Sequence, residues 1–105
     1  MEIQRKDLII GAIYRAEWQD NGLRRNILRF NGFQDPPSFC CKPCSFINSV
    51  DNYWKESRCC GDKTKFYNAT IEEIVWLEAC EKDRKTVPKP NFKQLEQTYI
   101  SLIFN

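Results

Sequence analysis

IIGAIYRAEWQDNGLRRNILRFNGF, residues 9 to 33, decides the fold of this chain. Two strand-like runs flank Asn21-Gly22, a dipeptide that tolerates the positive φ angles of a tight turn. We therefore expect a β-hairpin with these two residues as its loop. In that register Trp18 lies opposite Arg25 and Tyr14 lies opposite Arg29, all on one face of the hairpin.

A helix is predicted in the second half of the chain. Thr70 followed by Glu73 matches the capping box, in which each residue satisfies a free backbone N–H group at the start of a helix. The apolar residues that follow form a wide stripe, so we expect burial on more than one side, with Trp76 inside. Asn91 and Gln94 repeat the capping pattern and predict a last helix after the stiff connector at residues 87–90.

These elements predict an α+β fold. Residues 45–50 and 53–58 have the composition of short strands that could extend the hairpin into a small antiparallel sheet. We expect this sheet to pack against two C-terminal helices. A chain of 105 residues is large enough for one core and too small for two lobes, so residues 1–105 are interpreted as a single domain.

Charge and terminal composition limit the partners and the compartment. Sixteen basic and 14 acidic residues leave a net charge of +2, which does not indicate a partner held by bulk charge alone. The start of the chain is charged, and the next apolar run, residues 8–13, is too short for a signal-peptide core or a membrane span. We therefore expect a cytoplasmic protein that does not associate with membranes.

The sequence does not favour catalysis. It contains no histidine, the side chain most often used for acid–base chemistry at neutral pH. Its four glycines form no nucleotide-binding loop. The glutamates of the predicted helix are explained by capping and solvation. We interpret the chain as a non-enzymatic protein and infer no small-molecule substrate.

The cysteine-rich segment, CCKPCSFINSVDNYWKESRCC at residues 40–60, allows three interpretations. Cys41 and Cys44 form a C-x-x-C pair that could hold zinc with Cys59 and Cys60. Adjacent cysteines in an extended chain point to opposite faces, so one of them could be the third ligand, with Cys40 or Cys80 as the fourth. The thiols could instead be buried as small hydrophobic groups, which is our main interpretation. Disulfides are the third possibility and do not fit a reducing compartment. No cofactor is expected, and zinc is the alternative.

Arginine interleaved with aromatic rings marks the candidate binding surface. Guanidinium groups and rings together can contact phosphates and stack on bases or on the side chains of a protein partner. The same mixture recurs in the cysteine-rich segment. The predicted binding residues are Tyr14, Trp18, Arg24, Arg25 and Arg29 in the hairpin, and Tyr53, Trp54, Lys55 and Arg58 in the later segment.

Residues 68–90, NATIEEIVWLEACEKDRKTVPKP, resemble a segment that recurs in small uncharacterised proteins of bacteriophages and prophages of the Bacteroidota. The matching residues are Ala69, Thr70, Glu72, Glu73, Trp76, Leu77, Glu78, Ala79, Cys80 and Pro88. The resemblance covers about a fifth of the chain. It implies a phage-type α+β domain that acts in the cytoplasm of the host cell and has no known catalytic residue.

Small phage proteins without enzymatic motifs often inhibit host defence, as anti-CRISPR proteins do. By this analogy of class we expect a binding protein that inhibits a nucleic-acid-guided defence complex of the host. Its partner is expected to be the effector protein, its guide RNA or both. The alternative is a zinc-stabilised accessory protein that binds nucleic acid.

Overall fold

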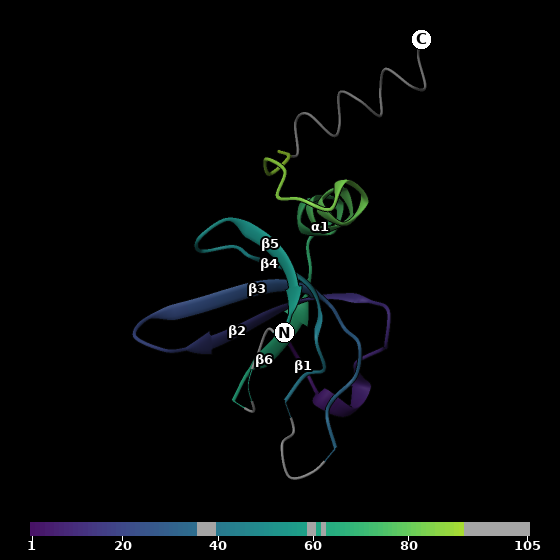
Figure 1. The fold of residues 1–105 in the computed structure, drawn as a ribbon. Helices are drawn as coiled ribbons and strands as arrows, with labels where there is room; N and C mark the ends of the chain where they lie inside the picture. The colour runs from purple at the N-terminus through teal and green to yellow at the C-terminus, as the bar shows by residue number, and fades with distance from the viewer. Residues whose placement is uncertain (36–39, 59–60, 62, 92–105) are drawn as a thin grey trace.

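A six-stranded antiparallel sheet and one α-helix form the part of the chain that the computed structural model describes, which is residues 1–35, 40–58, 61 and 63–91 (Figure 1). The strand order is β1-β6-β2-β3-β4-β5. The strands are β1 (Glu2–Ile3), β2 (Ile13–Gln19), β3 (Leu23–Arg29), β4 (Cys44–Asn48), β5 (Tyr53–Ser57) and β6 (Lys65–Asn68). A 3₁₀ turn, η1 (Arg5–Asp7), follows β1, and the helix α1 (Ile71–Asp83) follows β6. The predicted α+β class is confirmed.

The hairpin β2–β3 forms where it was predicted, but its register is shifted by one residue. Asn21 and Gly22 have the expected positive φ angles of 54° and 114°. Pairing nevertheless begins at Gln19 and Leu23, so Asp20 also belongs to the loop, and its N–H donates to the Gly22 carbonyl at 2.9 Å. Because strand side chains alternate between faces, this shift separates the predicted partners onto opposite faces of the sheet.

Helix α1 begins as the capping box predicts. The Glu73 N–H donates to Thr70 Oγ1 at 3.1 Å, and the Thr70 N–H donates to Glu73 Oε1 at 2.8 Å. The helix ends at Arg84, whose φ of 53° places it in the left-handed region. Trp76 is only 2% exposed, which confirms its predicted burial.

Each face of the sheet carries its own hydrophobic core. On the face that contacts α1, Ile27 and Ile47 pack with Trp76, Leu77 and Cys80 of the helix. On the opposite face, the core is covered by the N-terminal segment and by the chain between β3 and β4, which lie on the side of the sheet away from α1 (Figure 1). Its buried residues are Tyr14, Ala16, Leu28, Phe30, Cys41, Cys44, Phe46 and Phe66.

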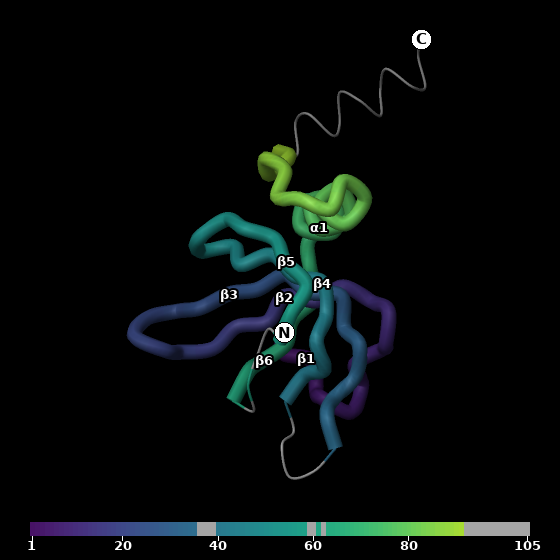
Figure 2. The backbone as a smooth tube through the Cα atoms, in the orientation of Figure 1, coloured from purple at the N-terminus to yellow at the C-terminus, as the bar shows by residue number. Residues whose placement is uncertain are grey.

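The segment that follows α1 folds back beside the helix (Figure 2). The Trp76 indole donates from Nε1 to the Val87 carbonyl at 2.7 Å, and the Val87 N–H donates to Cys80 Sγ at 3.5 Å. Thr86 lies against β5, where its Oγ1 accepts a hydrogen bond of 2.7 Å from the Trp54 N–H. The last predicted helix, from Asn91 onward, lies almost entirely outside the described residues, which contain only the helix α1 and the short turn η1.

Candidate functional site

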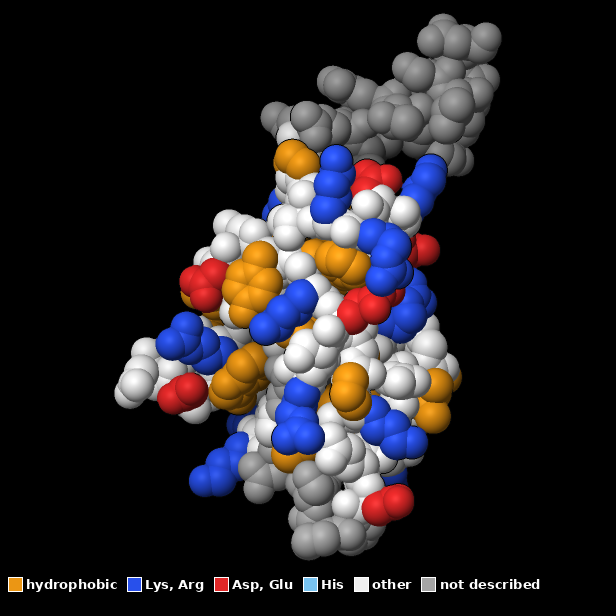
Figure 3. All heavy atoms as spheres, viewed as in Figure 1, with side chains coloured by type: hydrophobic (Ala, Val, Ile, Leu, Met, Phe, Trp, Pro, Cys, Tyr) orange, Lys and Arg blue, Asp and Glu red, His pale blue; other side chains and the backbone are white. Residues whose placement is uncertain are grey.

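The sheet leaves part of one face uncovered at the end that carries the hairpin loop. Strand pairing aligns Ala16, Asn26, Asn48 and Tyr53 across β2, β3, β4 and β5, so side chains two positions along each strand share their face. This rule places Trp18, Arg24, Tyr53 and Lys55 on the side away from α1, and we call these four residues the open face. Aromatic and basic side chains gather there over the hairpin and β5 (Figure 3).

The open face alternates rings with cations. Trp18 and Arg24 are direct partners across β2 and β3. The Tyr53 side chain is 37% exposed, and the Lys55 ammonium lies 5.5 Å from the centre of its ring. Arg24 donates from Nε to the Asp20 carbonyl at 3.1 Å, which fixes its stem near the loop. Within the described residues, neither Arg24 nor Lys55 forms an ion pair.

The other predicted hairpin arginines lie on the face that contacts α1, which corrects the predicted grouping. Arg29 donates to both carboxylate oxygens of Glu81 in α1, at 2.8 and 2.9 Å. Arg25 pairs with Glu17 across the strands at 3.0 Å. Neither guanidinium therefore lies over the ring that the sequence pattern had assigned to it, because the extra loop residue turned both arginines to the other face.

The remaining predicted binding residues have different surroundings. Tyr14 is only 6% exposed and belongs to the core, where its hydroxyl accepts a hydrogen bond from the Ile9 N–H at 2.9 Å. Trp54 packs against the α1 core and donates from Nε1 to Ser45 Oγ at 2.8 Å. Arg58 follows β5 and is exposed. The structure thus brings together four of the nine predicted residues.

The contact between Arg29 and Glu81 shifts the pKa of both side chains. Burial alone would raise the pKa of Glu81, but hydrogen bonds from Arg29 and Ser45 and the charge of Arg29 outweigh burial and lower it. The hydrogen bond to Glu81 raises the pKa of Arg29 in turn. The pair is therefore fully charged at neutral pH and joins α1 to β3.

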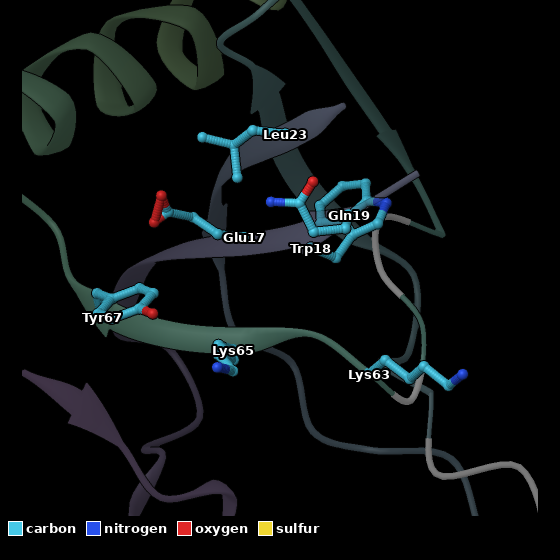
Figure 4. Close-up of a pocket in the computed structure, with 7 residues that line it drawn as sticks. All are labelled: Glu17, Trp18, Gln19, Leu23, Lys63, Lys65 and Tyr67. Atoms are coloured by element: carbon cyan, nitrogen blue, oxygen red, sulfur yellow. The ribbon is translucent and has the colours of Figure 1, made fainter. Parts of the chain in front are cut away.

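A groove of about 320 Å³ begins where β6 stops pairing with β2. The last pair between these strands is Glu17 with Lys65, so Trp18 and Gln19 lie at an edge of β2 with no β6 partner among the described residues. Figure 4 shows the lining side chains along the end of the hairpin and the start of β6. This edge groove is lined by Glu17, Trp18, Gln19, Leu23, Lys63, Lys65 and Tyr67.

Positive charge dominates the edge groove. The Glu17 carboxylate is already neutralised by Arg25 at 3.0 Å and by Arg15 at 3.7 Å. Lys63 and Lys65 are both exposed, and neither forms an ion pair with any residue that the structure describes. Two lysine charges therefore face solvent along this groove, and the Arg15 guanidinium lies 5.4 Å from the centre of the Tyr67 ring.

Sequence reasoning missed most of the edge groove. Lys65 and Tyr67 belong to β6, which pairs with β2 across about 50 residues of chain, and Lys63 lies in the turn just before β6. One signal could have shown part of it, because Lys65 and Tyr67 are spaced by two and so share one face of a strand. Their meeting with Trp18 depends on long-range pairing that no local pattern reveals.

The described cysteines include both free thiols and one disulfide-bonded residue. Cys41 is 1% exposed and forms a disulfide bond, which corrects its interpretation as a buried thiol. Cys80 does keep a thiol, with no exposed surface, and burial raises its pKa. A sulfur in a disulfide is not a thiolate and does not ligate zinc. No metal-ligating group of three or more side chains occurs in the described part of the chain.

The predicted zinc ligands are only partly described. Cys44, the first residue of β4, is buried in the core on the face away from α1. Cys59 and Cys60 lie outside the described residues. A zinc site that uses Cys41 requires the reduced chain, and it stays a prediction.

Comparison with known proteins identifies no relative of this chain. No protein-family model, curated protein or solved structure matches this chain. The resemblance of residues 68–90 to phage proteins therefore stays a prediction.

No helix among the described residues is both long enough and apolar enough to cross a membrane.

Proposed function

We propose that this protein is a non-catalytic binding protein whose open face binds single-stranded RNA. The observation that carries the proposal is the placement of Trp18, Arg24, Tyr53 and Lys55 on one sheet face, where Tyr53 and Lys55 are exposed and Trp18 and Arg24 are half-buried. Unpaired bases stack on exposed rings, and nearby cations contact the phosphates between them. An antiparallel sheet supplies this combination with little rearrangement, because its side chains are already aligned.

The distribution of ion pairs supports the choice of surface. Arg15, Arg25 and Arg29 all lie on the face that contacts α1 and pair with glutamates there. They help to hold the fold together, and their charges are offset. No acidic residue that the structure describes pairs with Arg24 or Lys55, so the two cations of the open face remain able to bind phosphate.

The phage-type resemblance extends the proposal to a biological partner. By analogy of class, the RNA is the guide of a host defence complex, and the protein inhibits that complex by occupying it. This extension rests on the resemblance of residues 68–90. The RNA-binding proposal rests on the open face and can be tested separately.

The test is fluorescence anisotropy with a labelled 12-nucleotide oligouridylate. Tyr53→Ala should weaken binding roughly 5- to 150-fold, because stacking of a base on an aromatic ring contributes about 1–3 kcal/mol. The matched control is Lys82→Gln combined with Lys85→Gln, two exposed lysines in the last turn of α1 and just after it. Arg24→Gln with Lys55→Gln makes the same change of charge on the open face and should weaken binding, whereas the control should not.

Salt dependence separates RNA from a protein partner. Each phosphate contact with a single strand contributes about 0.7 to the slope of log affinity against log salt, so the two cations of the open face alone predict a loss of about sevenfold between 50 and 200 mM. A wild-type protein that does not bind the oligonucleotide, or binds it equally well after Tyr53→Ala, would show that the open face does not bind RNA.

A further inference from the structure

We infer that the edge groove is a single-nucleotide pocket that extends the open face around the edge of β2. The base lies against the Tyr67 ring on the α1 side of the sheet, the strand reaches it past the edge of β2 at Trp18, and the phosphate lies at Lys63 and Lys65. This inference rests on the proposed function, since it supplies the next binding position of the same RNA strand. It adds a site on the other side of Trp18, formed mainly by residues that the open face does not include.

Continuity between the two surfaces is the first argument. Trp18 belongs to the open face by strand alternation and also lines the edge groove. It can do both because β6 stops pairing at Glu17, which leaves the edge of β2 beside Trp18 uncovered by the described strands. A strand that stacks on Trp18 from the open face therefore reaches the groove by passing this edge.

Size and shape are the second argument. A volume of about 320 Å³ lies at the lower end of the range for small-molecule pockets, which is about 300–1,000 Å³. A pocket of this size suits one nucleotide and not a longer segment. Its apolar surface comes from the rings of Trp18 and Tyr67 and from Leu23, which is 46% exposed.

Unused polar groups are the third argument. The Tyr67 hydroxyl, the Gln19 side-chain amide and Trp18 Nε1 form no hydrogen bond with any residue that the structure describes. Together they offer donors and acceptors to the edge of a base. The ammonium groups of Lys63 and Lys65 supply the matching positive charge for a phosphate.

The groove is also electrostatically suited to an anion despite its carboxylate. Glu17 has two guanidinium groups within 4 Å, from Arg25 and Arg15. These two arginines offset the negative charge of Glu17. The net charge that the groove presents to a ligand therefore comes from Lys63 and Lys65. A cationic ligand would meet both of these lysines, so a nucleotide phosphate fits better than an amine.

The experiment compares two double variants in the same oligouridylate assay. Lys63→Gln with Lys65→Gln should lower the salt slope by about 1.4, since two phosphate contacts are lost at about 0.7 each. Lys82→Gln with Lys85→Gln removes the same charge elsewhere and should leave the slope unchanged. Equal slopes for the two double variants would overturn the pocket.

A second measurement uses uridine 5′-monophosphate alone and follows the indole N–H signals by NMR. The Trp18 signal, assigned from Trp18→Phe, should shift on titration and lose its shift in the Lys63→Gln/Lys65→Gln variant. The Trp76 signal should stay fixed, because its N–H donates to Val87 inside the protein.

The two proposals fail in different ways. If the 12-nucleotide strand does not bind, the proposed function is wrong and the groove loses its role as an extension. If the strand binds through Tyr53 but neither the salt slope nor the Trp18 signal responds to the groove lysines, only the pocket is wrong.

Discussion

Reversing the charge of Arg29 tests the register on which the candidate site depends. Arg29 holds the Glu81 carboxylate through two hydrogen bonds of 2.8 and 2.9 Å and donates a third to the Gly11 carbonyl at 2.7 Å. The side chains of the pair remain 37% and 22% exposed, so solvent screens the attraction. In the two-residue-loop register, Arg29 would instead lie on the open side and could be replaced with little loss of stability.

The magnitude follows from the geometry. Loss of a partly exposed ion pair costs about 1 kcal/mol, and repulsion between two carboxylates about 4 Å apart adds about 1 kcal/mol. Arg29→Glu should therefore lower the free energy of unfolding by about 2 kcal/mol and the melting temperature by about 10 °C. Thermal unfolding followed by circular dichroism measures this shift.

The control and the rescue make the test specific. Arg24→Glu reverses a charge in the same strand on the open face and should cost less than about 0.5 kcal/mol. Combining Arg29→Glu with Glu81→Arg restores opposite charges and should recover part of the lost stability. Equal melting temperatures for the two single variants, or a swap no more stable than Arg29→Glu, would refute the register and the ion pair.

Three further predictions concern the cores, acid stability and the cysteines. Trp76→Ala should lower the free energy of unfolding by about 3–5 kcal/mol, because it removes a buried ring; an unchanged urea midpoint would contradict this. The pKa of Glu81 is lowered in the folded state, so the contribution of this carboxylate to stability is complete at neutral pH and is lost as pH falls through that lowered value. Glu81→Gln should therefore make the free energy of unfolding fall less steeply as the solution is acidified. An identical fall in the variant and the wild type would argue against the ion pair. The oxidised chain, with Cys41 in a disulfide, should retain no zinc after dialysis, and one zinc per chain by elemental analysis would show that the cysteines serve as ligands.

Local signals in the sequence were enough to predict several elements. The turn at Asn21-Gly22 locates the hairpin, and the pair Thr70 and Glu73 locates the start of α1, because both depend on residues close together in the chain. Burial of Trp76 followed from its place in a wide apolar stripe. In each case the physical cause acts within one turn or one helix, where a single sequence contains the necessary information.

The arrangement of the candidate site was less predictable. The predicted binding role of Trp18, Arg24, Tyr53 and Lys55 stays a prediction, and their grouping with Arg25 and Arg29 was wrong. One additional loop residue, Asp20, exchanged the two faces of β3. The pairing of β6 with β2 was also beyond local inference, since its register depends on contacts between segments far apart in the chain.

The hydrogen bond between the Trp54 N–H and Thr86 Oγ1 affects whether β5 can pair with a strand from a second copy of the protein. An outermost strand with free backbone donors can recruit a strand from a second copy, which is a common route to aggregation. Thr86 occupies one such donor on β5, and the exposed Arg84–Glu56 pair places charged groups along the same border. A second sheet would have to displace this covering segment before it could add a strand there, so the turn after α1 helps to limit growth of the sheet as well as to pack the helix.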